Sequence, residues 1–133
     1  MKKLTIFTDG GARGNPGPAA IGVIFYDKDK EVYSHGECIG RATNNVAEYK
    51  AVIKALKLVE DKFKDCEIEL NLDSELVCKQ LNGEYKVKDE NLKELFYQVR
   101  ERVLDLGGKV SFRHVRREQN KKADCLVNRA LDE

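Results

Sequence analysis

The chain has 133 residues, a length that fits one domain with its own hydrophobic core and leaves little room for a second. Its 24 basic and 23 acidic residues give a formal net charge of +1, which excludes a strong overall field for nucleic acid. The first apolar stretch is too short for a signal peptide, and no segment has the length of a membrane span. We therefore expect one domain over residues 1–133, located in the cytoplasm and away from membranes.

The first predicted strand, residues 3–8, alternates in polarity and leads into Asp9 and a loop rich in glycine and proline. Glycine allows backbone geometries closed to other residues and lets a ligand approach closely, while proline stiffens the loop. The segment therefore places a candidate metal ligand beside exposed amides, although Asp-Gly after an extended run also signals a hairpin. Two more predicted strands, residues 19–26 and 31–39, are joined by a charged turn and complete a meander.

From Asn45 onward, apolar residues recur at intervals of three and four, which predicts an amphipathic helix to about residue 59. Asn45 and Glu48 have the spacing of a capping pair. The remaining predicted elements are a strand at 67–73, helices at 74–81 and 91–106, a strand at 109–114 and a helix at 119–131. The order βββ-α-β-α-α-β-α predicts an α/β fold: a five-stranded mixed sheet with helices on both faces.

Four acids stand at similar places in this order: Asp9 and Asp73 after strands, Glu48 and Asp124 near helix starts. Each has a plain interpretation as a turn residue, a cap or an acid favoured by the helix dipole. Carboxyl ends of parallel strands, however, share one edge of a sheet, so we expect the acids to converge. Such a cluster suits divalent cations with oxygen ligands, and two cations would support in-line phosphodiester hydrolysis.

Four motifs carry a family resemblance that spans nearly the whole chain: 8–18, 41–48, 72–74 and 120–127. They read Thr-Asp-Gly-Gly with the Gly/Asn/Pro loop, Arg-Ala-Thr-Asn-Asn-Val-Ala-Glu, Leu-Asp-Ser and Asn-Lys-Lys-Ala-Asp-Cys-Leu-Val. In this order they resemble type 1 ribonuclease H, in a compact form without the basic protrusion of many bacterial members. The resemblance implies a ribonuclease H-like fold and a monomeric, metal-dependent endonuclease. It would hydrolyse the RNA strand of RNA–DNA hybrids and leave 5′-phosphate and 3′-hydroxyl ends; cleavage of double-stranded RNA stays open.

The resemblance also assigns roles to individual residues. It implies that two Mg²⁺ or Mn²⁺ ions per substrate-bound site are held by the catalytic acids Asp9, Glu48, Asp73 and Asp124. It implies substrate contacts, to RNA 2′-hydroxyls and to a DNA phosphate, from Gly10, Gly11, Ala12, Arg13, Asn15, Arg41, Thr43, Asn44 and Asn45. Glu75 stands where the family often has a glutamine that contacts the minor groove, so the resemblance makes it a further candidate for substrate contact. His114 has the spacing of the catalytic histidine, with Arg116 or Arg117 as substitutes and a structural histidine as the alternative.

Two regions of the chain remain open to more than one interpretation. Residues 109–122 carry six basic residues against one acidic residue, which indicates either a surface for an anion or a solvated face. Together with residues 85–88 they are candidates to replace the missing protrusion. Four cysteines, at 38, 66, 78 and 125, lack zinc-ligand spacing, and we interpret them as reduced core thiols. A silent binding module or an integrase-like transferase are the alternative functions, which the four acids and the segment from Asn44 to Glu48 disfavour.

Overall fold

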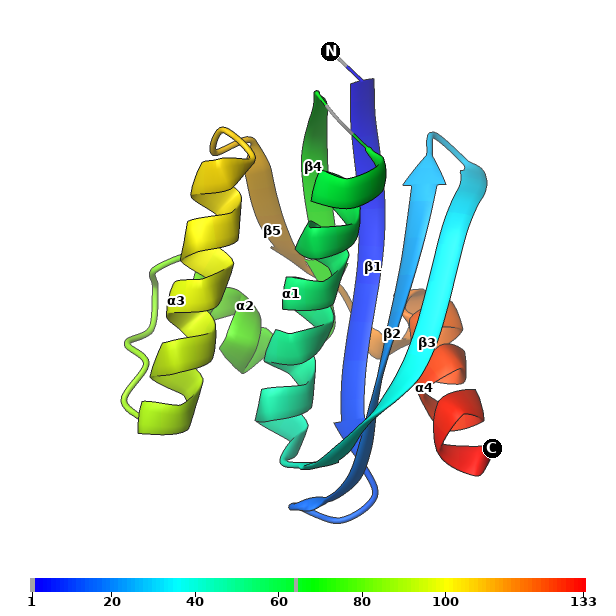
Figure 1. Cartoon of the computed structure of the whole chain (residues 1–133), viewed down its shortest axis with the longest axis vertical. Helices are drawn as coiled ribbons and strands as arrows, with labels where there is room; N and C mark the ends of the chain where they lie inside the picture. Colours follow the sequence, from blue (N-terminus) through cyan, green and yellow to red (C-terminus); the bar gives the residue numbers. More distant parts are fainter. Residues whose placement is uncertain (1, 64) are drawn as a thin grey trace.

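The computed structural model describes residues 2–63 and 65–133 and shows the predicted order of strands and helices (Figure 1). The elements are β1 (Lys2–Ala12), β2 (Gly17–Asp27), β3 (Lys30–Ala42), α1 (Asn44–Lys62), β4 (Cys66–Leu72), α2 (Glu75–Leu81), α3 (Glu90–Asp105), β5 (Val110–His114) and α4 (Lys121–Asp132). A short 3₁₀ helix that the sequence pattern did not predict, η1 (Arg117–Gln119), precedes α4. No helix among the described residues has the length and apolar character needed to cross a bilayer.

The five strands form one mixed sheet in the order β3-β2-β1-β4-β5. The meander of β1, β2 and β3 is antiparallel, whereas β4 runs parallel to both β1 and β5. Helices α1 and α3 pack together on one face, and α4 packs against β2 and β3 on the other (Figure 1). The predicted mixed sheet with helices on both faces is therefore confirmed.

The main hydrophobic core lies between the sheet and α1. Alternate residues of the strands and the residues of one α1 face are fully buried there; they include Leu4, Ile6, Phe25, Ile68, Leu70, Val52, Leu56 and Val59. These are the period-two and period-3.6 positions of the sequence pattern. A buried hydrogen bond from the Tyr49 hydroxyl to Gln80 Oε1, 2.7 Å long, ties α1 to α2 within this core. The core thus fixes α1 against the strands that carry the acids.

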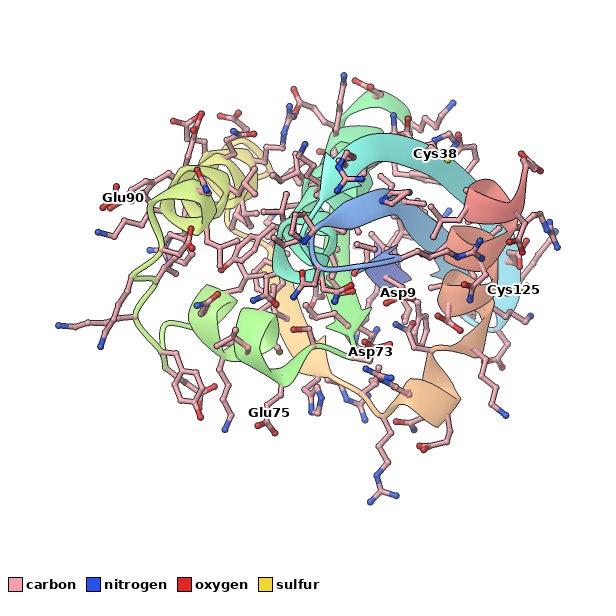
Figure 2. The ribbon with its side chains drawn as sticks, turned by 90° about the horizontal axis from the view of Figure 1, so that it is seen from below. Asp9, Cys38, Asp73, Glu75, Glu90 and Cys125 are labelled. Carbon is pink, nitrogen blue, oxygen red and sulfur yellow. The ribbon has the colours of Figure 1, made fainter. Side chains whose placement is uncertain are left out.

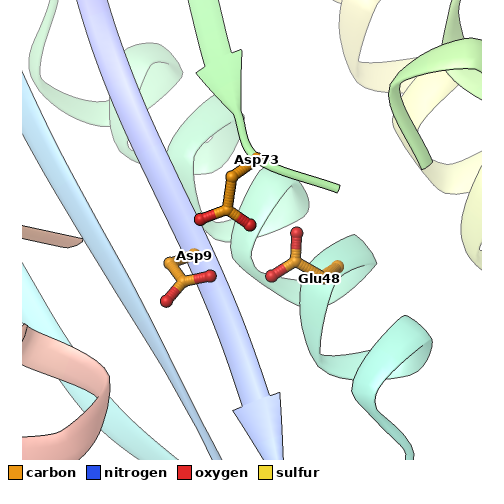
Figure 3. A group of neighbouring side chains, drawn as sticks. All are labelled: Asp9, Glu48 and Asp73. Atoms are coloured by element: carbon orange, nitrogen blue, oxygen red, sulfur yellow. The ribbon is translucent and has the colours of Figure 1, made fainter. Parts of the chain in front are cut away.

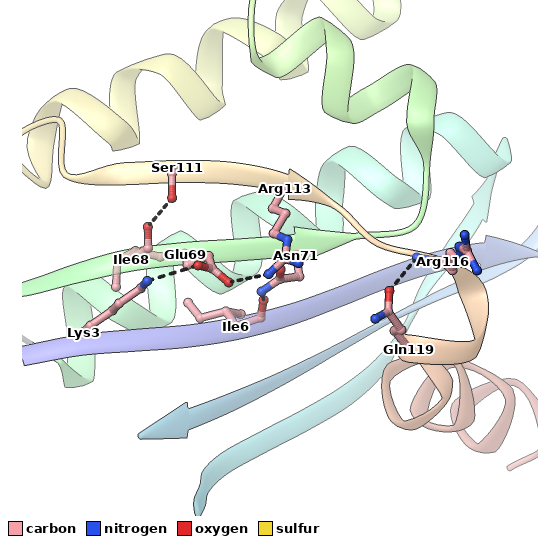
Figure 4. Close-up of polar contacts among 9 residues, drawn as sticks. All are labelled: Lys3, Ile6, Ile68, Glu69, Asn71, Ser111, Arg113, Arg116 and Gln119. Carbon is pink, nitrogen blue, oxygen red and sulfur yellow. Dashed lines mark hydrogen bonds and ion pairs between the residues drawn. The ribbon is translucent and has the colours of Figure 1, made fainter. Parts of the chain in front are cut away.

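On the sheet face opposite α1, the strands β1, β4 and β5 carry polar side chains, because α4 packs mainly against β2 and β3 (Figure 4). Lys3 Nζ lies 3.1 Å and Arg113 NH1 3.7 Å from the Glu69 carboxylate. The hydrogen bond from Lys3, together with the charge of Arg113, holds the pKa of Glu69 below its ordinary value. Asn71, from β4, donates from Nδ2 to the carbonyl oxygen of Ile6 in β1 at 3.2 Å.

Several predicted details are wrong. β1 continues to Ala12, so Asp9 lies within the strand and not at its end. The predicted capping pair of Asn45 and Glu48 does not form: Thr43 caps α1, accepting the Val46 amide proton on Oγ1 at 3.2 Å. The last helix begins at Lys121, not at residue 119, because η1 intervenes. Among the cysteines, residue 78 is buried as predicted, whereas 38 and 125 are exposed and 66 is half-buried.

Candidate active site

Three carboxylates converge at the carboxyl edge of the parallel strands (Figure 3). Asp9 comes from β1, Asp73 follows β4 directly, and Glu48 reaches over from α1. One carboxylate oxygen from each lies within 4.8 Å of the others. Asp9 and Glu48 are 7% and 6% exposed, whereas Asp73 is half-buried. The sheet and α1 thus bring together three oxygen ligands from three separate segments.

Strand register explains how Asp9 and Asp73 meet. β1 and β4 are parallel neighbours, and their pairing ends with Thr8 opposite Leu72. The residue after each member of this pair is an acid, so the side chains of Asp9 and Asp73 lie next to each other just beyond the last pair. β1 continues past this point only as the partner of β2, where Asp9 lies opposite Gly22. The end of β4 thereby opens the space beside Asp9.

Gly10 allows α1 to approach β1 closely enough for Glu48 to join the two aspartates. A Cβ atom at residue 10 would overlap the carbonyl group of Ala47 in α1. The Gly10 amide instead donates to Glu48 Oε1 at 2.6 Å. Glycine at this position therefore serves the close packing of helix on strand and holds the Glu48 side chain.

Burial and the crowding of the acids raise the pKa values of Asp9 and Glu48. Burial, together with the charges of Asp73 and Asp124, raises the pKa of Asp9 to about 7. Burial and the neighbouring Asp9 also raise the pKa of Glu48 well above its ordinary value. Without a cation the cluster therefore retains protons near neutral pH. A divalent cation with oxygen ligands would favour the ionised form of these groups.

Asp124 lies in the first turn of α4, is exposed, and lines the same cavity. It is not one of the three acids whose oxygens lie within 4.8 Å. Its charge nevertheless contributes to the raised pKa of Asp9. The structure thus places three of the sequence-derived acids in one tight cluster and the fourth beside it in the same cavity.

The cavity over these acids has a volume of about 560 Å³ and opens at the end of the molecule seen in Figure 2. Most of the sequence-derived substrate residues line it: Gly10, Gly11, Ala12, Arg13, Asn44, Asn45 and Glu75. Ser74 and Asn128 also line it, and no sequence pattern assigned them a role. Ser74 caps α2 through its Oγ, so the alternative interpretation of Asp73 as that cap is wrong.

Three substrate candidates stand back from this cavity. Asn15 ties its loop to the start of α1, because its Oδ1 accepts the amide proton of Asn44 at 3.0 Å. Asn44 Oδ1 in turn accepts from Ala12 N at 2.9 Å, which leaves the Asn44 amide nitrogen to donate outward. Thr43 is the cap of α1, and Arg41 is exposed near the end of β3. These contacts give the loop a fixed shape beside the cavity.

His114 and Arg117 occupy different places relative to the acids. His114 ends β5, with Nε2 3.2 Å from the backbone oxygen of Asp73, and it does not line the cavity. Arg117, carried by η1, does line it and has no ion-pair partner among the described residues. The sequence indicated both only as candidates, since η1 leaves no periodic signal of its own.

The basic residues of segment 109–122 have different neighbours. Arg113 contacts Glu69 on the open sheet face, and Arg117 lines the cavity that holds the acids. Lys121 and Lys122 line a second hollow of about 560 Å³ floored by residues of β1 and β2. Segment 85–88 lies apart from all of these, in a hollow against α3.

Comparison with known proteins relates the chain to a defined group. The family model described as reverse transcriptase-like matches residues 7–130. The structure of LC11-RNase H1, isolated from compost by a metagenomic approach, matches with a TM-score of 0.93 at 47% identity and covers 99% of this chain and 97% of that one. The crystal structure of LC11-RNase H1 in complex with an RNA/DNA hybrid matches equally well, with a TM-score of 0.93, 46% identity and coverage of 98% and 97%.

Two curated relatives are longer than this chain. Ribonuclease HI of Halobacterium salinarum is 44% identical over 132 residues, which are 98% of this chain and 65% of that protein. The bifunctional protein Rv2228c of Mycobacterium tuberculosis is 38% identical over 134 residues, 98% of this chain and 36% of that protein. The chain thus spans about two thirds and about one third of the length of these two relatives.

Proposed function

Because the chain belongs to the type 1 ribonuclease H family, we propose that it is a metal-dependent endonuclease acting on the RNA strand of RNA–DNA hybrids. The observation that carries the proposal is the cluster of Asp9, Glu48 and Asp73 at the floor of an open cavity. A relative of 46% identity has been crystallised with an RNA/DNA hybrid, which supports the same substrate class here. The products would carry 5′-phosphate and 3′-hydroxyl ends.

The donor set fits divalent cations. Three carboxylates within 4.8 Å of one another, with Asp124 in the same cavity, offer only oxygen ligands, which Mg²⁺ and Mn²⁺ prefer. We propose that these four acids hold two such ions when the hybrid is bound. Bound ions supply positive charge to the leaving oxygen and favour deprotonation of the attacking water. The raised pKa values of Asp9 and Glu48 support a site that is poised to exchange protons for a cation.

The other groups of the cavity suit recognition of the RNA strand. A ribose 2′-hydroxyl both donates and accepts, so backbone amides and carboxamides are suitable partners. The loop of Gly11 and Ala12 supplies backbone groups, and Asn44 and Asn45 supply side chains, along one wall of the cavity. Several such contacts in a row would distinguish ribose from deoxyribose.

Positive charge for the substrate backbone comes from two directions. Arg117 lines the same cavity as the acids, so we propose that it contacts a phosphate near the cleavage site and assists departure of the product. Arg41 lies farther away, near the start of α1, where a phosphate of the DNA strand would also meet a helix N-terminus. His114 contacts the backbone of Asp73, and a direct role in proton transfer is a weaker proposal for it.

The test is cleavage of labelled duplexes by the purified protein in Mg²⁺, in Mn²⁺ and in EDTA. We expect cleavage of the RNA strand of RNA–DNA in either metal, none in EDTA and none of an all-DNA duplex. Four consecutive ribonucleotides in DNA should suffice, whereas a single one should be cut poorly because one hydrogen bond contributes only about 0.5–1.5 kcal/mol. Binding of the hybrid without cleavage in any metal would indicate a silent binding module instead. An RNA–RNA substrate decides whether double-stranded RNA is also cut.

The metal used in the cell, the monomeric state, the cytoplasmic location and the extent of one domain over residues 1–133 stay predictions.

A further inference from the structure

Asn120 has a buried side chain that contacts Asp73, one of the clustered acids. It lies between η1 and α4 and is 1% exposed. Its Nδ2 donates to the backbone oxygen of Thr8 at 2.9 Å and to Asp73 Oδ2 at 3.0 Å. The Thr8 carbonyl and an ionised Asp73 carboxylate can only accept hydrogen bonds. If the side-chain amide of Asn120 were flipped, its oxygen would face these two acceptors and neither hydrogen bond could form. The contacts therefore determine the orientation of the amide.

This arrangement is not the one that helix stability favours. Asparagine at an N-cap commonly accepts a hydrogen bond from an amide in the first helical turn. Asn120 occupies the N-cap of α4 but makes no such bond, and its Oδ1 is buried without a hydrogen-bond partner among the described residues. A buried acceptor without a partner lowers stability. The side chain instead directs both of its amide protons toward the ends of β1 and β4.

Through these contacts Asn120 adjoins three of the four acids. Thr8, which accepts one proton, directly precedes Asp9, and Asp73 accepts the other. The backbone oxygen of Asn120 also accepts the amide proton of Asp124 at 3.1 Å. One residue thus links β1, β4 and α4 at the point where the carboxylates they carry converge.

We propose that Asn120 is a positioning residue for the metal site. Its amide holds the Asp73 carboxylate by Oδ2 against repulsion from the neighbouring acids and sets the distance between the ends of β1 and β4 before a cation binds. Hydrogen bonds to ligating carboxylates fix their orientation, and their loss commonly lowers metal affinity or activity about 10- to 100-fold. The inference rests on the proposed function, because it assigns a cation to the acid cluster.

The experiment compares the wild-type chain with Asn120→Ala and Asn120→Asp. Calorimetric titration of the hybrid-free protein with Mn²⁺ measures metal affinity, and initial rates over a series of Mg²⁺ concentrations give kcat and KM for the hybrid. We expect the Mn²⁺ dissociation constant of Asn120→Ala to rise about tenfold or more. Its kcat should fall at low Mg²⁺ and recover in part at high Mg²⁺, with the KM for the hybrid little changed. Asn120→Asp keeps the size of the side chain but places an acceptor against Thr8 and Asp73. We therefore expect it to lose more Mn²⁺ affinity and more kcat than Asn120→Ala.

Asn71→Ala is the matched control. Asn71 is also 1% exposed and also links β4 to β1, through a hydrogen bond from Nδ2 to the Ile6 carbonyl (Figure 4). Its hydrogen bonds go to Ile6 and Glu69, outside the four acids. We expect Asn71→Ala to lower thermal stability and leave the Mn²⁺ dissociation constant near the wild-type value.

The outcomes separate the inference from the proposed function. If the wild-type enzyme is active and Asn120→Ala has the same Mn²⁺ affinity and the same metal dependence, the positioning role is overturned and the proposed function stands. Equal weakening of Mn²⁺ binding by Asn71→Ala would reduce the effect to general loosening of the sheet and would also overturn it. A wild-type chain that neither binds Mn²⁺ nor cleaves the hybrid would refute the proposed function itself. If Asn120→Ala does not fold, Asn120→Asp supplies the comparison.

Discussion

Replacement of Asp9 by asparagine should abolish cleavage and at the same time stabilise the metal-free protein at pH 8. The side chain is 7% exposed and shares its surroundings with Glu48, Asp73 and Asp124. Removing its charge weakens the binding of a cation, because one ligand of the cluster becomes neutral. Removing the charge also relieves repulsion among the acids and the cost of burying an ion.

The expected gain in unfolding free energy follows from the pKa of Asp9. Burial, with the neighbouring charges, raises it from 3.8 to about 7. At about 1.36 kcal/mol per unit, the difference corresponds to about 4 kcal/mol between the protonated and the ionised form. Because the folded state holds the proton more tightly, this stabilisation is fully present below pH 3.8 and is lost as the pH rises through about 7. Since Glu48 shares protons with Asp9, we expect Asp9→Asn to gain about 2–4 kcal/mol at pH 8.

Urea denaturation in EDTA at pH 8 and at pH 5 provides the measurement. At pH 8 the variant should be more stable than the wild type, and at pH 5 the difference should shrink because Asp9 is then mostly protonated. Adding Mg²⁺ should stabilise the wild type and leave the variant nearly unchanged. A variant that is less stable at pH 8, or a difference that does not depend on pH, would refute the electrostatic reasoning. Wild-type cleavage in the variant at several Mg²⁺ concentrations would remove Asp9 from the site.

Five further substitutions test other parts of the structure. Arg117→Ala should lower kcat/KM about tenfold or more in steady-state assays, whereas His114→Ala should have the smaller effect; the reverse order would return the role to the histidine. Thr43→Ala removes a helix cap and should lower the free energy of unfolding by about 1 kcal/mol. Arg41→Ala should raise the KM for the hybrid and leave stability and kcat little changed. Gly10→Ala should lower the melting temperature sharply, because its new methyl group would overlap the α1 backbone; an unchanged melting temperature would contradict the close packing.

The sequence alone determined the kind and order of the elements. Period-two runs and a period-3.6 stripe record local burial, and the structure confirms each resulting strand and helix within a few residues at its ends. Glycines after α2 and α3 correctly marked where those helices stop, since Gly83 and Gly107 adopt positive φ angles of 77° and 79°. The motifs also carried the family resemblance, which the comparisons confirm.

Local patterns were less reliable where a residue has two competing partners. Asn45 and Glu48 have the spacing of a capping pair, but Thr43 begins the helix and Glu48 bonds to the amide of Gly10 in β1. Asp9 was expected at the end of its strand, yet pairing with β2 carries the strand on to Ala12. In both cases a partner from a distant segment decided the local conformation.

The geometry of the acid cluster and of its surroundings depended on the tertiary structure. Asp9 and Asp73 are neighbours because β1 and β4 pair in one particular register, and Asn120 reaches both strand ends only because α4 packs across the sheet. The position of Arg117 at the cavity likewise depends on η1, a single turn with no periodicity. Sequence patterns report the burial of residues a few positions apart, whereas distances between segments far apart in the chain are set by strand register and helix packing.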